Sequence, residues 1–194
     1  MKNYQNAGFV GLQFQVNNAE KVIVQGVEAN GDLAIGHGLT ASAGVNYVDA
    51  HYDKFTGGSC YFGRVPDNGA GGCILSGEAL PLTPNWRTNL GVQYKHPVPV
   101  GEVYSRVDWN WQSSMLANTN LDPRSRQDAY SLVNFRVGAK VDNGLDVSLW
   151  ANNIFDTVYT QADYVSNVFG PGDPAFQRYL GRPREYGVTV RKNF

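Results

Sequence analysis

The spacing between strand-like segments constrains the fold of this chain more than any single motif does. Alternating apolar and polar residues predict eight β-strands, at 8–16, 22–35, 39–51, 85–96, 102–113, 129–141, 145–155 and 184–194. From the second strand onward, short connections alternate with long ones. The short connections are Gly36 to Gly38, Pro97 to Gly101 and Asp142 to Gly144, and the long ones are 52–84, 114–128 and 156–183. A meander of this kind has its turns at one end and its loops at the other.

Each expected strand has one apolar and one polar face. In the strand at 102–113, for example, Val103, Val107 and Trp109 share a face, and Arg106 and Asp108 share the opposite one. Across the strands the apolar faces are thin, the polar faces carry several arginines and lysines, and aromatic residues gather near strand ends. Together with the sorted connections, these features predict an all-β, antiparallel up-and-down transmembrane β-barrel, with lipid outside and a water-filled lumen.

Two other folds use the same alternation. A soluble barrel of lipocalin type would turn the apolar faces inward around a ligand. A self-contained eight-stranded outer-membrane barrel with a structural or adhesive role would close around a side-chain-filled interior, although the polar faces carry few carboxylates to pair their cations in a narrow lumen. An open sheet of eight strands would leave two unpaired edges and would aggregate or need partner strands.

Composition excludes several classes of protein. The net charge of −1 leaves no basic stripe for nucleic acid. No run approaches the roughly 18 apolar residues of a membrane-spanning helix. The first six residues are polar and lead directly into a strand, so we expect no signal peptide and therefore a mature product or a fragment.

The two cysteines, Cys60 and Cys73, both lie in the longest loop. In an oxidising compartment a disulfide between them would order that loop and stabilise it by roughly 3 kcal/mol. Two free thiols or a metal pair are the alternatives, and no histidine lies nearby in the sequence to complete a metal site. We favour the disulfide, with a structural role.

No pattern in the sequence predicts an enzyme, a cofactor or a metal site. Asn118, Asn120 and Asp122 resemble the start of a calcium loop, but Pro123 stands where glycine is needed, so we interpret them as a polar loop tip. The three histidines lie in separate turns and strand ends, and no Ser/His/Asp arrangement is evident. Five charged residues of the long loops are candidates for contact with an extracellular ligand, and simple solvation is their alternative role: Arg64, Asp67, Asp163, Asp173 and Arg178.

Four phrases of the sequence resemble one known family. The segment Val147 to Asp156, followed by Tyr159, is similar to a penultimate strand that reads V-x-N-L-F-D-x-x-Y, and Leu180 to Val190 is similar to a final strand that opens with G-R-P-R. The other two phrases are Gln25-Gly26-Val27-Glu28 within 19–28, and Leu80-Pro81-Leu82-Thr83-Pro84 followed by Asn89-Leu90-Gly91. In this order they resemble the C-terminal part of the 22-stranded β-barrel of TonB-dependent receptors.

The resemblance implies a function and a set of partners. A TonB-dependent receptor in the outer membrane of a Gram-negative bacterium takes up a scarce nutrient such as a ferric siderophore, cobalamin, haem or a carbohydrate. Its plug domain is not recognisable in residues 1–194, so contact with the TonB-type energy-coupling protein would depend on missing N-terminal parts. The partners expected for this portion are outer-membrane lipid, the barrel assembly machinery and a small nutrient ligand.

The last strand carries the residues expected to serve as the assembly signal. They alternate along one face: Tyr186, Val188, Val190 and the terminal Phe194. Lys192 stands where the family has an aromatic or aliphatic residue facing lipid. Near the periplasmic rim we expect its ammonium group to reach the headgroups.

Overall fold

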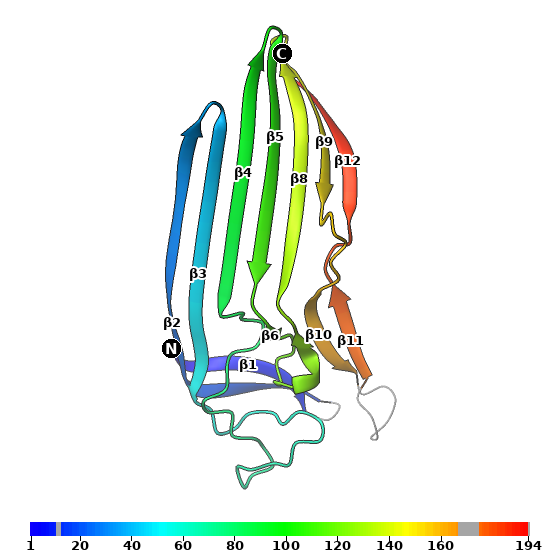
Figure 1. Ribbon diagram of the computed structural model, residues 1–194. Coiled ribbons are helices and arrows are strands. Elements are labelled where there is room, and N and C mark those ends of the chain that lie inside the picture. Colours follow the sequence, from blue (N-terminus) through cyan, green and yellow to red (C-terminus); the bar gives the residue numbers. More distant parts are fainter. Residues whose placement is uncertain (11–12, 167–174, 194) are drawn as a thin grey trace.

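The chain folds into one curved antiparallel sheet with irregular loops at one end (Figure 1). The computed structural model describes residues 1–10, 13–166 and 175–193. The sheet has the order β1-β2-β3-β4-β5-β8-β9-β12. Its strands are β1 (Lys2–Val10), β2 (Gln13–Gly36), β3 (Leu39–Lys54), β4 (Trp86–Val98), β5 (Gly101–Gln112), β8 (Tyr130–Val141), β9 (Leu145–Asn152) and β12 (Glu185–Lys192). The predicted all-β, up-and-down meander is confirmed.

The connections sort by length as the sequence predicts. The short turns that follow β2, β4 and β8 lie at the end of the sheet nearest the C-terminus, and the long loops lie at the opposite end (Figure 1). The first of these turns requires glycine, because Gly36, His37 and Gly38 all have positive φ. The long loops contain short elements of their own: β6 (Met115–Leu116), the 3₁₀ helix η1 (Pro123–Ser125), β7 (Arg126–Gln127), β10 (Thr160–Ser166) and β11 (Ala175–Leu180).

Strand register aligns the apolar residues into rows that cross the sheet. One unbroken row runs through Leu33, Ala41, Val92, Val107, Phe135, Ala151 and Tyr186. Large side chains of this face are exposed to the surroundings on each of β2, β3, β4, β5, β8, β9 and β12. A soluble sheet would bury such a face, so its exposure fits a wall that stands in lipid.

The apolar band has the height of a membrane. Trp86, whose ring lies 4.6 Å from that of Tyr47, marks the loop end of the band on β4, and Tyr94 and His96 mark its turn end. The ten residue steps from Trp86 to His96, at about 3.4 Å each, span roughly 34 Å along the strand. At the usual barrel tilt this length corresponds to a band of about 25 Å along the membrane normal.

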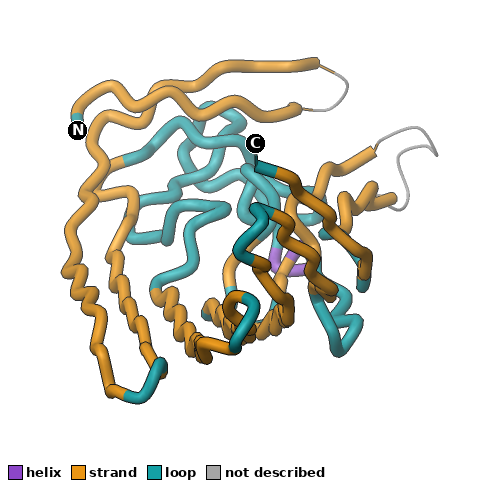
Figure 2. The backbone as a smooth tube through the Cα atoms, turned by 90° about the horizontal axis from the view of Figure 1, so that it is seen from above, coloured by secondary structure: helices purple, strands orange, loops and turns teal. Residues whose placement is uncertain are grey.

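The sheet is an open arc. β12 pairs with β9, and residues 21–36 of β2 pair with β3, while β1 pairs only with the first residues of β2, as far as Lys21. Among the described residues no register joins β12 to β1 or β2, and the view along the strands shows the arc unclosed (Figure 2). This finding contradicts a self-contained closed barrel, and the exposed apolar face contradicts a lipocalin-like one.

Two boundary predictions are wrong. The expected strand at 8–16 is a hairpin, since β1 ends at Val10, β2 begins at Gln13 and these two residues are paired. Pro97, which we placed in a turn, pairs with Glu102 at the end of β4. Proline is tolerated there because it lies near the last step of the ladder. In the described part of the chain, no helix is long and apolar enough to cross a membrane.

Candidate functional site

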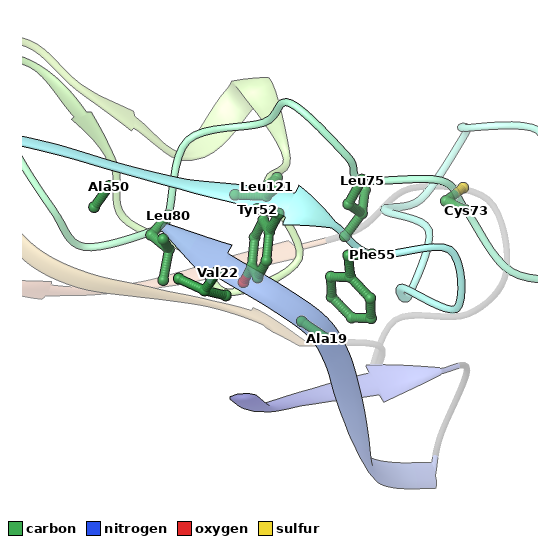
Figure 3. Close-up of a cluster of buried hydrophobic side chains, with 9 residues drawn as sticks. All are labelled: Ala19, Val22, Ala50, Tyr52, Phe55, Cys73, Leu75, Leu80 and Leu121. Atoms are coloured by element: carbon green, nitrogen blue, oxygen red, sulfur yellow. The ribbon is translucent and has the colours of Figure 1, made fainter. Parts of the chain in front are cut away.

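The first two long loops pack on a buried apolar cluster at their end of the sheet (Figure 3). β2 and β3 supply Val22 and Tyr52, the loop after β3 supplies Phe55 and Leu75, and the loop after β5 supplies Leu121. The rings of Tyr52 and Phe55 are 5.0 Å apart. Segments distant in sequence therefore share one core, which gives the loops a fixed arrangement rather than leaving them as separate solvated excursions.

A disulfide closes the tip of the first long loop. Cys60 and Cys73 are bonded, with Cα atoms 5.1 Å apart, and Cys73 is fully buried in the cluster. Inside this loop the side-chain oxygen of Asn68 accepts hydrogen bonds from the backbone N–H groups of Ala70 (2.9 Å) and Gly72 (2.8 Å). The loop tip is therefore held both covalently and by local hydrogen bonds.

Arg64 and Asp67, two predicted ligand contacts, bind each other at this tip. Arg64 Nη2 lies 3.2 Å from Asp67 Oδ2 and also donates to the carbonyl of Ile74 at 2.8 Å. The pKa of Asp67 is lowered first by the backbone N–H of Ile74, which donates to Oδ1 at 2.6 Å, and further by Arg64. Both side chains thus contribute to loop structure, while the Asp67 carboxylate keeps an exposed edge.

The three long loops meet at an ionic junction formed by Arg124 and the buried carboxylate of Asp122. Asp122 is fully buried and forms an ion pair with Arg124 Nη2 at 2.7 Å. The Arg124 guanidinium also donates to the Phe62 carbonyl at 3.0 Å and lies 5.3 Å from the ring centre of Phe176 on β11. This one arginine therefore touches all three long loops.

The residues that resembled a calcium loop form part of this junction. Asn118 and Asp122 are buried, and backbone N–H groups donate in succession to the side chains of Asn118, Asn120 and Asp122. Among the described residues no group of three or more His, Cys, Asp or Glu side chains could hold a metal ion. The interpretation as a polar loop tip is wrong, because the segment is internal. The apolar residues Leu116, Ala117 and Leu121 that flank it were the available signal.

Asp163 and Arg178, two further predicted ligand contacts, face each other across the β10–β11 hairpin. Arg178 Nε lies 3.5 Å from Asp163 Oδ2, and the Asp163 side chain is only 1% exposed. Burial raises the pKa of Asp163 above its ordinary value, and this effect exceeds the lowering by Arg178. Neither Asp163 oxygen has a hydrogen-bond partner among the described residues. Asp173, the fifth predicted contact, lies outside the described residues.

The inner face of the sheet is largely polar between the turn end and the apolar cluster at the loop end. Arg106 and Asp108 form an ion pair at 2.6 Å, and Tyr104 donates a hydrogen bond to Asp146 at 2.9 Å. A hollow of about 390 Å³ opens beside Arg106 and is lined on β2 and β3 by Asp32, Thr40 and Ser42 among others. Such a surface suits contact with water or with another polar domain, not with lipid.

The predicted assembly residues alternate on the outer face of β12. Tyr186, Val188 and Val190 are all exposed there, and Phe194 lies outside the described residues. Lys192 donates a hydrogen bond to the carbonyl of Asn143 in the neighbouring turn.

Comparison with known proteins gives one matching family. The model described as "TonB dependent receptor-like, beta-barrel" matches residues 1–154, about four fifths of the chain. No curated protein is similar enough in sequence to match.

Solved structures share the fold at low sequence identity. The ferric yersiniabactin uptake receptor FyuA from Yersinia pestis has 18% identity and a TM-score of 0.71 over 93% of this chain and 25% of its own. The ferric-catecholate import receptor Fiu from E. coli has 18% identity and a TM-score of 0.63 over 100% of this chain and 24% of its own. The copper transporter OprC has 12% identity and a TM-score of 0.66 over 97% of this chain and 25% of its own.

This chain spans about a quarter of the length of those structures. The family comprises outer-membrane transporters of Gram-negative bacteria, not enzymes. The outward apolar rows and the sorted loops of this chain fit such a barrel. With most of its residues matched by the family's barrel model, the chain belongs to the TonB-dependent receptor-like β-barrel family.

Proposed function

We propose that this chain is the C-terminal portion of the barrel wall of a TonB-dependent transporter that takes up a scarce nutrient across the outer membrane. The observation that carries the proposal is the open eight-stranded arc, apolar outside and largely polar inside, whose two edges have no strand partner among the described residues. The G-R-P-R segment that opens its last strand supports a C-terminal position in the barrel.

Within that transporter, the ordered loops would form part of the extracellular ligand site. Arg64, Asp67 and Arg178 keep exposed edges next to their ion-pair partners, so they offer charged groups already held in place for a polar ligand. A ferric siderophore is the ligand class we favour, because two of the similar structures are receptors for ferric ligands. Cobalamin, haem, a carbohydrate or copper would need the same extracellular access.

The remaining parts of the receptor would supply energy and gating. A plug domain would fill the lumen against the polar inner face, and a TonB-type energy-coupling protein would act on segments outside residues 1–194. The barrel assembly machinery would read the outward residues of β12, namely Tyr186, Val188 and Val190.

Uptake measurements test this proposal. The complete receptor that carries this chain is produced in a Gram-negative host without ferric-siderophore receptors of its own, and accumulation of radioactive iron is followed with a panel of siderophores. We expect accumulation with one siderophore class, lost when the coupling protein is deleted. Accumulation that persists without the coupling protein would contradict the proposal.

A pair of arginine variants in the same assay tests the role of the loops. Arg178→Gln should raise the half-saturating siderophore concentration, because it removes a charged group from the ligand end of the barrel. Arg191→Gln makes the same charge change on the lumenal side of β12, away from the loops, and should leave that concentration unchanged. Equal effects of the two substitutions would contradict a ligand contact at Arg178.

A further inference from the structure

The base of the loop between β9 and β12 is a fixed platform. We define the β9–β12 loop base as residues 153–159 and 180–186. Asn153 Nδ2 donates to the carbonyls of Thr157 (2.9 Å) and Arg182 (3.2 Å), and the N–H of Arg184 donates to Asp156 Oδ1 at 2.8 Å. These bonds hold the two segments side by side and fix the backbone from which two arginines project.

The side chains of these two arginines have few partners. Arg182 is 84% exposed, and its one ion pair within the described part of the chain is with Glu185, at 3.8 Å. The Arg184 guanidinium makes no hydrogen bond or ion pair with any residue the structure describes. Tyr186, Val188 and Val190 lie on the outward side of β12. The same two-residue alternation, extended by two residues before Tyr186, places Arg184 on the outward side of the wall. Two guanidinium groups are thus available to an anion near the end of the strand.

Large apolar side chains of the same loop base are exposed. Tyr186 is 81% exposed, Phe155 72% and Val158 74%, and Leu180 is also exposed. Tyr186 ends the apolar row that crosses the whole outer face, through its register partner Ala151 on β9. Tyr186 therefore continues the surface that faces lipid into the loop base, at the end where the long loops leave the membrane.

We propose that the β9–β12 loop base binds a phosphate-bearing lipid of the outer leaflet. Guanidinium groups bind phosphate through paired, charge-assisted hydrogen bonds. Arginines at the edge of an apolar band reach the headgroup layer while adjacent aromatic side chains rest at the same level. Acyl chains would lie along Tyr186 and Val188, and the phosphate would lie between Arg182 and Arg184.

The outward position favours a lipid over the other anions in the surroundings. A nutrient ligand would enter through the lumen, which lies on the opposite face of the wall, where Thr189 and Arg191 alternate with the outward residues of β12. Free phosphate would gain nothing from the exposed apolar side chains, whereas a lipid gains from both parts of the surface. The inference depends on the orientation of the barrel in the outer membrane and not on which nutrient it carries.

Lipid titration of the complete receptor tests the inference. The purified receptor in detergent is titrated with bisphosphorylated lipid A, with dephosphorylated lipid A and with inorganic phosphate, and bound lipid is counted by native mass spectrometry. The test variant is Arg182→Gln with Arg184→Gln, and the control is Arg191→Gln, which removes one arginine charge elsewhere on β12. Heat-modifiable gel mobility confirms that the wild type and both variants are folded.

The expected result is a loss of affinity for bisphosphorylated lipid A of about tenfold or more in the double variant, since its charge-assisted hydrogen bonds are gone. The Arg191→Gln control should bind like the wild type, dephosphorylated lipid A should bind weakly to all three, and inorganic phosphate should not compete. Equal lipid A binding by the double variant and the wild type would overturn the inference, and so would displacement of the lipid by inorganic phosphate. Nutrient uptake is measured in parallel, so that failure of transport and failure of lipid binding are seen separately.

Discussion

The indole ring of Trp150 lies against Gly187 across the last pair of strands in the sheet. The two residues are register partners, and a Cβ atom at position 187 would stand 2.6 Å from Cζ2 of the ring. The indole N–H also donates to Thr189 Oγ1 at 3.2 Å. An aromatic ring over a glycine in this way shields the bare backbone and joins β9 to β12 on the inner face.

Substitution of Gly187 should therefore weaken this strand pair. Gly187→Val would force the ring of Trp150 to move, and we expect a loss of about 1–3 kcal/mol of unfolding free energy. Urea unfolding of the complete receptor in lipid vesicles, followed by tryptophan fluorescence, measures the change. Gly31→Val is the matched control, because a Cβ atom at Gly31 meets nothing within 4 Å. Equal stability of the two variants would show that the ring contact has no energetic role.

Removal of the Cys60–Cys73 disulfide should loosen the loops and spare the sheet. The bond closes a loop with a sequence separation of 13 residues. The chain-entropy estimate for such a loop is about 3 kcal/mol. In the Cys60→Ser, Cys73→Ser variant we expect faster proteolysis within 55–85 and an unchanged heat-modifiable shift of the barrel. If proteolysis of this loop is as slow as in the wild type, the apolar cluster alone holds the loop.

The docking of the β10–β11 hairpin should depend on pH through Asp163. Because burial raises its pKa, the folded state holds the Asp163 proton more tightly than the unfolded chain does. Docking is therefore favoured below the ordinary aspartate value of about 3.9 and weakens as the pH rises through the folded pKa. Hydrogen-exchange protection factors of 160–166 and 175–180 should fall over this range, and Asp163→Asn should abolish the dependence and raise protection at neutral pH.

The disulfide loop should respond to pH in the opposite direction, through Asp67. Its pKa is lowered by the Ile74 N–H and by Arg64, so its contribution to loop order is present above the ordinary value and is lost as the pH falls. Protection in the disulfide loop should accordingly decrease in acid, where the hairpin is better docked. If protection in the β10–β11 hairpin and in the disulfide loop changed in the same direction with pH, the roles given to Asp163 and Asp67 would be wrong.

The sheet could be predicted from the sequence because each of its strands carries its own pattern. The alternation of Val103, Val107 and Trp109 with Arg106 and Asp108 specifies two faces without knowledge of any neighbour, and the register places these residues as expected. The expected strand at 8–16 failed because residues on both sides of a hairpin turn can continue the same alternation. The two-residue alternation of a strand does not by itself show where the chain turns back to form a hairpin.

The loop end was less predictable because its contacts join distant segments. Tyr52, Leu75 and Leu121 form one cluster, yet none of the three lies within twenty residues of another in the sequence. The charged residues Asp163 and Arg178 were recognised one by one as candidates for a ligand, but their pairing depends on the β10–β11 register. A charged residue in a loop sequence therefore does not show whether it binds a ligand or another residue of the chain.

Isolated residues 1–194 should fail to form a closed barrel. Within the described residues, β2 and β12 leave the arc with unpaired edges, and backbone groups on those edges cannot remain unsatisfied in lipid. Exported to the outer membrane by itself, the chain should be degraded or aggregated and show no heat-modifiable band, whereas the complete receptor should show one. A heat-modifiable band from the isolated chain would mean that its edges close by themselves.

The orientation of the wall is tested most directly by an accessibility scan along β8 in the complete receptor. Single spin labels at positions 132 to 137 are compared for collision with molecular oxygen, which concentrates in lipid, and with a water-soluble nickel chelate. We predict a period of two, with the positions of Val133, Phe135 and Val137 accessible to oxygen and those of Leu132, Asn134 and Arg136 accessible to the chelate. If oxygen reached the second set of positions and the chelate the first, or if accessibility did not alternate, the apolar rows of this wall would not face the membrane.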